Sequence, residues 1–392
     1  MGEAVIVSTA RTAIGTARKG TLADLSAVDL AVVAVGGLLE RAGVPSEYID
    51  DLQMGESLQG GGDLARFTAV ELGLLNVPGV ALQRHCASGM AAVQGAAGSV
   101  MAGMDKVVIA AGTESISTTP GSMKRRLPGD EMGPWMSASH RETPDAPAWD
   151  MSITVGWNTA QRSDVSREQM DEWSYESHRR AINAIDEGRF EEEIVPFEVT
   201  RRDGTTTMFQ VDEHPRRETT LERLAGLKPI HPEIEGFSIT AGNSSGLNDA
   251  AAAIMICDSE FAKAHGLVPL AVIKSWANAA LAPRDTGLGP VYAIPKALER
   301  AGLSVEDMDL VEINEAFASM AVASTRILGF DHDIVNVNGS GCSLGHPIAA
   351  TGARMVVTLI NELRRRGGGL GVASMCAAGG MGSATVLEVM PG

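Results

Sequence analysis

Two cysteines lie at turns where apolar segments give way to small residues. Cys86 follows the apolar segment 79–82 and precedes a small-residue segment with helical spacing. A cysteine in the first turn of a helix meets the positive end of the helix dipole, which favours the reactive thiolate. Its neighbouring peptide N–H groups could also face a carbonyl oxygen. Cys86 is therefore a candidate nucleophile, and a buried structural cysteine is the alternative.

The second cysteine, Cys376, ends a strand-like segment and enters the glycine-rich turn 377–382. Turns of this kind expose peptide N–H groups that can bind an oxyanion. Cys257 and Cys342 have no comparable setting, and we interpret both as packing residues.

A histidine and an asparagine occupy two further turns. His346 stands between Gly345 and Pro347 at the entry to a helix that we expect over 348–363. There it could take the proton of the Cys86 thiol and form a Cys–His pair; a capping or buried histidine is the alternative. Asn314 follows the apolar segment 310–313, where a buried helix should begin, and a role as N-cap would also explain it.

An internal repeat relates the segments that must position these residues. Residues 39–56 and 298–315 are identical at eight positions with a constant offset of 259. Each copy is followed by a small-residue helical stretch and then by a strand-like segment, at 106–112 and 371–375. We infer a duplication, although a leucine-rich helix that ends in glycine is a common pattern. Alternating apolar strands and small-residue helices predict an α/β fold with parallel sheets covered by helices.

The repeat divides the chain into three parts. We expect an N-terminal half over 1–115, to which the chain returns near residue 265, and a C-terminal half over 266–392. Between them lies a loop and cap region over 116–250. Its first part, 116–150, is too long for a simple connection and contains the basic cluster Lys124-Arg125-Arg126. Polar helices are expected over 163–194, beginning at a cap formed by Ser166 and Gln169.

Composition excludes several classes of protein. The 392 residues carry a net charge of −17, which disfavours nucleic acid as a partner because phosphate neutralisation supplies most of that affinity. No apolar run has the length of a membrane span. Four cysteines without a CxxC pair argue against a disulfide framework and against a structural metal site. We expect a soluble, cytoplasmic protein.

Five segments, in this order, resemble the thiolases, acyl-CoA C-acyltransferases that share a duplicated fold with ketoacyl synthases. They are the Cys86 segment, the segment 240–249, Asn-Glu-Ala-Phe at 314–317, Gly-His-Pro at 345–347 and Cys-x-x-Gly-Gly-x-Gly at 376–382. The resemblance extends from Ala10 to Gly382. It implies two similar βαβ-type halves in a layered αβαβα arrangement, with an inserted loop region.

The resemblance also implies a role for each candidate. Cys86 would carry the acyl group during cleavage of a 3-ketoacyl-CoA or the reverse Claisen condensation with acetyl-CoA. His346 would activate Cys86, and Asn314 would position a water that completes an oxyanion site. Cys376 would exchange a proton at the α-carbon of acetyl-CoA. The peptide N–H groups of Cys86 and Ala378 would form a second oxyanion site.

Coenzyme A would be a substrate and product and not a permanently bound cofactor, and the resemblance implies no metal. Arg216 would approach its nucleotide, and Ala241 and Ser245 belong to the segment expected along its pantetheine. Met151 and Phe317 would line the acyl channel. An acidic protein needs local cations to bind this anion, and the available ones are Lys124, Arg125, Arg126, Arg216, Arg217, Arg223 and Lys228. The family implies a homodimer or homotetramer.

Three departures from the family pattern bear on the site. Ala378 and Ala349 stand where glycine is usual, which would cost about 1 kcal/mol if the backbone there needed a positive φ. Asp150 precedes Met151, and its carboxylate would disfavour a plain alkyl chain unless it points away. A ketoacyl synthase-like condensing enzyme and a non-catalytic CoA- or lipid-binding protein are the alternatives; Cys376 and the CoA-type segment favour a thiolase.

Overall fold

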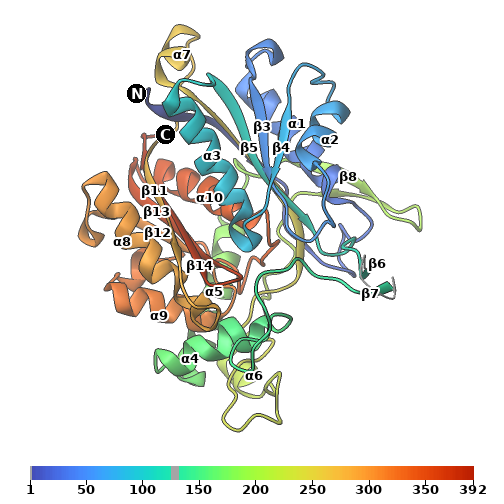
Figure 1. Cartoon of the computed structure of the whole chain (residues 1–392), viewed down its shortest axis with the longest axis vertical. Helices are drawn as coiled ribbons and strands as arrows, with labels where there is room; N and C mark the ends of the chain where they lie inside the picture. The colour runs from blue at the N-terminus through green and yellow to red at the C-terminus, as the bar shows by residue number, and fades with distance from the viewer. Residues whose placement is uncertain (1, 125–131) are drawn as a thin grey trace.

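A large mixed sheet forms the centre of the molecule. The computed structural model describes residues 2–124 and 132–392 (Figure 1). Neighbouring strands follow the order β12 (Leu310–Ile313), β13 (Gly369–Ala377), β14 (Met381–Val389), β11 (Ala271–Ala280), β1 (Ala4–Arg11), β10 (Asn248–Asp258), β5 (Val107–Ser115), β3 (Asp51–Gly55) and β4 (Gly79–Leu82), and β2 (Gly15–Thr16) pairs with β10. The strands β1 and β11 join the two halves of this sheet at Val5–Val272.

Parallel pairing is confined to the two ends of the sheet, so the expectation of parallel sheets was wrong for its centre. The parallel pairs are β3 with β4, β3 with β5, and β12 with β13, whereas the central strands pair antiparallel. Helices cover both faces of the central strands, so β10 and β5 are buried along their whole lengths. A strand buried on both faces has the same apolar composition whether it pairs parallel or antiparallel, so composition did not distinguish the two pairings.

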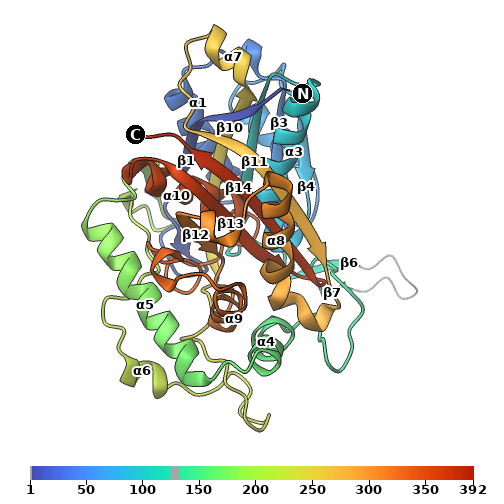
Figure 2. The same ribbon diagram turned by 90° about the vertical axis from the view of Figure 1, so that its left-hand side faces the viewer.

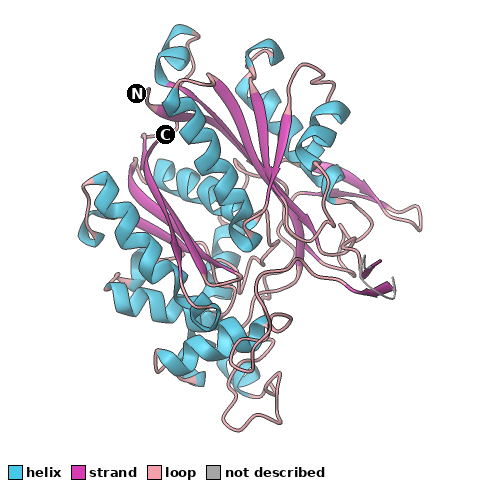
Figure 3. Cartoon of the chain, viewed as in Figure 1, coloured by secondary structure: helices cyan, strands magenta, loops and turns pink. Residues whose placement is uncertain are grey.

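The helices form layers on either side of the two half-sheets (Figures 1 and 2). Helices α1 (Ala27–Ala42) and α2 (Leu64–Glu71) pack against the first half. Between the half-sheets lie α3 (Ser88–Ala102) and α10 (Thr351–Arg365). The second half is covered by α5 (Arg167–Asp186), α8 (Gly289–Ala301) and α9 (Ala318–Leu328). This is the expected αβαβα arrangement (Figure 3).

Shorter elements occupy the connections. They are α4 (Asn158–Arg162), α6 (Leu221–Ala225), α7 (Ser259–Ala264), the π-helix η3 (Ser152–Trp157), the hairpins β6 (Ser122–Lys124) with β7 (Met132–Pro134) and β8 (Phe197–Thr200) with β9 (Thr206–Phe209), and the 3-10 turns η1 (Ser46–Tyr48), η2 (His85–Ala87), η4 (Pro283–Leu288), η5 (Val305–Asp307) and η6 (His332–Ile334). The predicted cap of α5 is present, because Ser166 and Gln169 form a reciprocal capping box. In the described part of the chain, no helix combines the length and apolarity needed to cross a membrane.

The repeat is visible in matched elements. Strands β5 and β13 are each nine residues long and lie 262 positions apart. Helices α3 and α10 are each fifteen residues long and lie 263 positions apart. Helix α10 begins at Thr351, three residues later than expected, because a turn over 347–350 precedes it.

Two glycines let the paired central helices touch. A Cβ atom on Gly89 would lie 2.6 Å from the carbonyl oxygen of Ala349, and one on Gly352 would lie 2.5 Å from the backbone nitrogen of Met90. Since nothing larger than glycine fits at these positions, the starts of α3 and α10 are in direct contact. This crossing brings together the turns that carry Cys86 and His346.

Candidate active site

A sharp turn presents Cys86 between β4 and α3. His85 has a left-handed backbone (φ 47°), which is uncommon for a residue with a side chain. Ser88 holds the turn closed: its Oγ accepts the Arg84 N–H at 2.9 Å and donates to the His85 carbonyl at 2.7 Å. Cys86 remains partly open to solvent. The strand–turn–helix passage predicted for Cys86 is therefore present.

The resting Cys86 thiol is protonated at neutral pH. Burial of the sulfur raises its pKa to about 11, and the charge of Glu114 adds to the rise. Peptide N–H groups of Ala378 and of Cys86 itself oppose these effects and stabilise the thiolate. The same two N–H groups are those that the sequence assigned to an oxyanion site.

His346 is a buried, neutral imidazole. Burial lowers its pKa to about 3, with a smaller effect from the positive charge of Arg354. The Thr351 hydroxyl donates to the Pro347 carbonyl at 2.9 Å and therefore has to accept from His346 Nδ1, at 2.7 Å. This leaves the lone pair on Nε2, the nitrogen that can act as a base.

Asn248 holds the backbone of His346. Its Oδ1 accepts the His346 N–H at 3.0 Å, and its Nδ2 donates to the Gly15 carbonyl. Gly345 has φ 104°, and a side chain there would overlap Asn248. Asn248 and Thr351 are thus part of the site, although no sequence motif predicts a role for either in holding His346.

Asn314 lies beside His346. Its Nδ2 is 3.4 Å from Nδ1 and 3.5 Å from Nε2 of the ring. The Asn314 Oδ1 is buried and makes no hydrogen bond with any described residue. A buried amide oxygen without a partner is a suitable place for an ordered water.

A small apolar cluster surrounds Cys376. Its members are Cys376, Val155, Ala316 and Met320, with Met151 and Phe317 packed against them. The Cys376 thiol contacts the Met320 sulfur at 3.5 Å. Burial raises its pKa well above the usual value, and the charge of Cys86 adds to this. The two thiols therefore lie near enough for their ionisations to interact, in surroundings lined by Met151 and Phe317.

The two alanines that depart from the family pattern are unstrained. Neither Ala378 nor Ala349 has a positive φ, whereas Gly379 and Gly380 do, at 88° and 80°. The left-handed turn after Cys376 is thus made by the two glycines. Because neither alanine has a positive φ, the strain energy considered for alanine at these positions does not apply. Ala378 keeps its N–H donor.

The CoA-type segment connects a surface cavity to the reactive turns. The cavity has a volume of about 370 Å³, and its lining includes Arg216, Ala241 and Gly242. Farther along the segment, Ser245 donates its N–H to the Ala316 carbonyl at 3.0 Å, and Leu247 forms a β-bridge with His346. Along the segment, Ser245 stands between Gly242, which lines the cavity, and Leu247, which pairs with His346; Ser245 itself does not line the cavity.

The candidate cations differ in their pairing. Arg217 pairs with Asp186, and Arg223 with Glu218. Arg216 forms no ion pair with a described residue and is exposed beside the cavity. Arg125, Arg126 and the Lys124 side chain fall outside the described residues.

Asp150 points away from the acyl-channel residues into a clamp of its own. It accepts the Ser152 N–H at 3.0 Å and the Ser152 hydroxyl at 2.6 Å. His231 Nε2 lies 2.7 Å from its other oxygen, and His231 Nδ1 lies 2.8 Å from Glu233. These partners occupy the carboxylate, so its charge does not exclude an alkyl chain.

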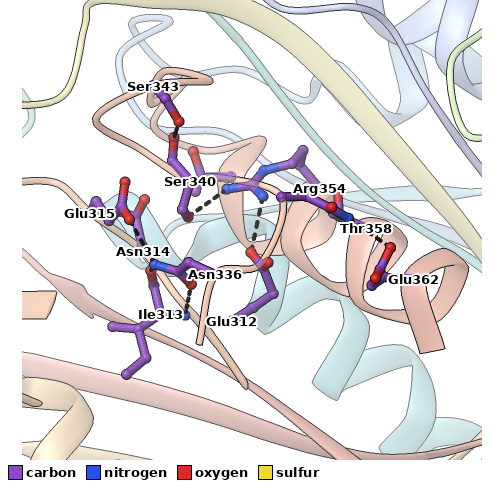
Figure 4. Close-up of polar contacts among 12 residues, drawn as sticks. Glu312, Ile313, Asn314, Glu315, Asn336, Ser340, Ser343, Arg354, Thr358 and Glu362 are labelled. Atoms are coloured by element: carbon purple, nitrogen blue, oxygen red, sulfur yellow. Dashed lines mark hydrogen bonds and ion pairs between the residues drawn. The ribbon is translucent and has the colours of Figure 1, made fainter. Parts of the chain in front are cut away.

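A buried polar network lies beneath Asn314 (Figure 4). Glu315 accepts hydrogen bonds from Trp173 Nε1 at 2.8 Å, from Asn336 at 2.9 Å and from the Cys342 N–H at 3.0 Å. Arg354 binds Glu312 at 3.2 Å. Glu315, which directly follows Asn314, is thereby bound to the loop that leads to His346. Cys342 and Cys257 are buried, in agreement with their interpretation as packing residues.

Known proteins match this chain along its whole length. Models of the thiolase N-terminal and C-terminal domains match residues 4–260 and 267–389. An acetyl-CoA acetyltransferase of Cupriavidus necator is 41% identical, over 99% of this chain and 100% of its own. A 3-ketoacyl-CoA thiolase of Bacillus subtilis is 40% identical over the same shares.

Solved structures agree. The Bacillus anthracis acetyl-CoA acetyltransferase has a TM-score of 0.91 and 39% identity, and covers 100% of this chain and 99% of its own. Human mitochondrial 3-ketoacyl-CoA thiolase in complex with CoA has a TM-score of 0.91 and 36% identity, over 99% and 98%. These matches do not favour a ketoacyl synthase-like enzyme or a non-catalytic member. The chain therefore belongs to the thiolase family of acyl-CoA acyltransferases.

Proposed function

We propose that this enzyme cleaves a 3-ketoacyl-CoA with CoA, or runs the reverse condensation with acetyl-CoA, through an acyl group on Cys86. The observation that carries the proposal is that the turn after His346 packs against the start of α3, directly after Cys86. His346 is neutral and basic at Nε2, and the Cys86 thiol interacts with the Cys376 thiol and with the N–H groups of Cys86 and Ala378. A nucleophile, a base, a second proton carrier and oxyanion donors are the groups that this chemistry needs.

In the cleavage direction, His346 Nε2 takes the Cys86 proton as the sulfur attacks the 3-keto carbon. The carbonyl becomes an oxyanion stabilised by peptide N–H groups. The bond between the keto carbon and the α-carbon then breaks, and its electron pair takes a proton from the Cys376 thiol to give acetyl-CoA. The CoA thiol next attacks the acyl-Cys86 thioester and its proton passes to the Cys376 thiolate, while Cys86 leaves and recovers its proton from His346.

Coenzyme A would enter along the segment 240–249. We assign its nucleotide end to the cavity beside Arg216 and Ala241, and its pantetheine to the path past Ser245 towards His346. The relative crystallised with CoA supports this choice of ligand. Asn314 Oδ1 would hold the water of the thioester oxyanion site.

A homodimer, or a homotetramer built from dimers, would use the free edge of β4. This strand is last in the sheet. Exposed apolar side chains lie on β4, on neighbouring α2 and in the turn between them: Val80, then Phe67 and Val70, and Leu75. An apolar edge strand is a ready template for pairing with a second copy. A cytoplasmic location and a role in fatty acid metabolism remain predictions.

Thiolysis assays test the proposal. Wild-type enzyme should consume acetoacetyl-CoA or a longer 3-ketoacyl-CoA only when CoA is present. Cys86→Ala should have no measurable turnover, and Cys376→Ala should also be inactive but should still acquire an acyl group from acetyl-CoA. Cys257→Ala, a buried cysteine outside the site, is the matched control and should stay active. An active Cys86→Ala enzyme would refute the proposal.

A further inference from the structure

The repeat creates a counterpart of the two-thiol site, and, like that site, it is formed by one residue from each half. Glu114 is the eighth residue of β5, and Cys376 is the eighth residue of the matched strand β13. Ala349 stands two residues before α10, as Cys86 stands two residues before α3. The counterpart thus has a carboxyl group in place of the second thiol and a methyl group in place of the nucleophile.

The carboxyl group of Glu114 fills this counterpart site. Glu114 is fully buried. One oxygen accepts the Ala349 N–H at 3.1 Å, and the other accepts the Leu58 N–H at 3.1 Å and the Gln59 side-chain amide at 2.6 Å. The N–H group before α10, equivalent to the oxyanion donor before α3, is therefore occupied by a side chain of the protein itself.

Glu114 also acts on the active site itself. Ala349 is three residues after His346, and its carbonyl lies where Gly89 and Gly112 leave room for it. By fixing Ala349, the carboxylate anchors the turn that carries His346 against the start of α3. Its negative charge acts on the Cys86 thiol and raises the pKa of that thiol.

The charge of Glu114 changes near neutrality. Burial raises its pKa to about 7, its three hydrogen bonds oppose the rise, and the charge of Glu56 adds to it. The ionisable group that acts on it from an adjacent element is Glu56, after β3. Glu114 in turn acts on Cys86, before α3. Asp249 on neighbouring β10 turns its carboxylate to Ser117.

We propose that Glu114 is a positioning residue of the acyl-transfer site: its carboxylate anchors the His346 turn through the Ala349 N–H, and its negative charge disfavours the thiolate of Cys86. This inference rests on the role proposed above for Cys86.

Alkylation of Cys86 by iodoacetamide tests the inference without requiring turnover. The rate is measured from pH 6 to pH 9, with the labelled peptide identified by mass spectrometry. At pH 8.5 wild-type Glu114 is ionised, so Glu114→Gln, which lacks this negative charge, should react roughly three- to tenfold faster than wild type. At pH 6 wild-type Glu114 is protonated, so the two proteins should react equally fast. The kcat of Glu114→Gln for thiolysis should fall, because the turn is less firmly held.

Controls separate this effect from general damage. Glu56→Gln removes a nearby buried carboxyl that does not bind Ala349, and it should alkylate at the wild-type rate at pH 8.5. Equal profiles for wild type and folded Glu114→Gln would overturn the inference. If Glu114→Gln does not fold, the pH profile of wild type provides the test. A plot of the logarithm of its alkylation rate against pH should bend to a lower slope near pH 7, and a straight line would overturn the inference. Label outside Cys86 would instead refute the proposed nucleophile.

Discussion

Thr351 sets the chemistry of His346 at the scale of one residue. Since its hydroxyl is already donated to the Pro347 carbonyl, it fixes the imidazole proton on Nδ1 and leaves Nε2 basic. Burial lowers the pKa of His346 and raises that of Cys86, so the resting pair is a neutral thiol and a neutral imidazole. The thiolate forms only as the sulfur attacks.

Removal of the Thr351 hydroxyl should impair catalysis more than binding. In Thr351→Val the ring loses the acceptor of its Nδ1 proton, and kcat should fall roughly ten- to a hundredfold, less than complete loss of a general base would cost. KM should change little. Thr351→Ser keeps the hydroxyl and should retain most of the activity. Equal kcat for Thr351→Val and wild type in steady-state thiolysis would show that the tautomer is not held this way.

The sequence predicted the candidate reactive residues but not their supports. Cys86, His346, Asn314 and Cys376 were predicted because motifs mark the turns that carry them. Thr351 and Asn248 reach His346 through contacts that depend on how the turn after Gly345 folds. No local pattern encodes such a contact, so it emerges only from the three-dimensional structure.

The crossing of α3 and α10 matters at the scale of elements. Gly89→Ala would place a methyl group 2.6 Å from the Ala349 carbonyl. Overpacking of this kind should lower the free energy of unfolding by about 1–3 kcal/mol and separate Cys86 from His346. Gly98→Ala is the matched control on the same helix, because its Cβ would lie 3.7 Å from Trp276, an ordinary contact. Denaturant unfolding measures both; a Gly89→Ala as stable as Gly98→Ala would contradict the crossing.

A second element, the segment that carries Met151, is held by the Asp150–His231–Glu233 clamp. The hydrogen bond to Glu233 raises the pKa of His231, and Asp150 adds to it. Burial opposes ionisation of Asp150, but hydrogen bonds from Ser152 and His231 lower its pKa overall. The His231 contribution is therefore complete below its unfolded pKa of about 6.5 and is lost as pH rises through the raised value. The Asp150 contribution is lost as pH falls through its lowered value.

Hydrogen exchange tests this pH dependence. After correction for intrinsic exchange rates, amides of η3 should be better protected at pH 6 than at pH 9. His231→Gln should remove most of that difference, and His265→Gln, a histidine remote from η3, should preserve it. Protection that does not vary with pH in wild type would exclude a role for the clamp.

Element boundaries show where sequence patterns stop being informative. The duplication followed from the repeat, and the layered arrangement followed from the resemblance to the thiolases. The antiparallel centre of the sheet did not, because burial on both faces hides strand direction. The turn before α10 was taken as helix because Pro347 suits a first helical position, whereas here it begins the turn whose Ala349 N–H binds Glu114.

At the scale of the molecule, the net charge of −17 repels an anionic substrate. Arg216, exposed and without an ion pair among the described residues, is the local exception beside the cavity. Arg216→Glu should raise KM for CoA roughly three- to tenfold, as expected for a screened surface charge, with a smaller change in kcat. Arg217→Glu, whose parent arginine pairs with Asp186, should have a smaller effect. An unchanged KM for Arg216→Glu at low ionic strength would remove Arg216 from the binding site.

The central claim is that Cys86 carries the acyl group and that Cys376 moves the proton. The most direct test is mass spectrometry of enzyme that has been incubated with acetyl-CoA, quenched in acid and digested. We predict an added acetyl group on the Cys86 peptide, present in wild type and in Cys376→Ala and absent in Cys86→Ala. An acetyl group on Cys376, or one that persists in Cys86→Ala, would contradict the account.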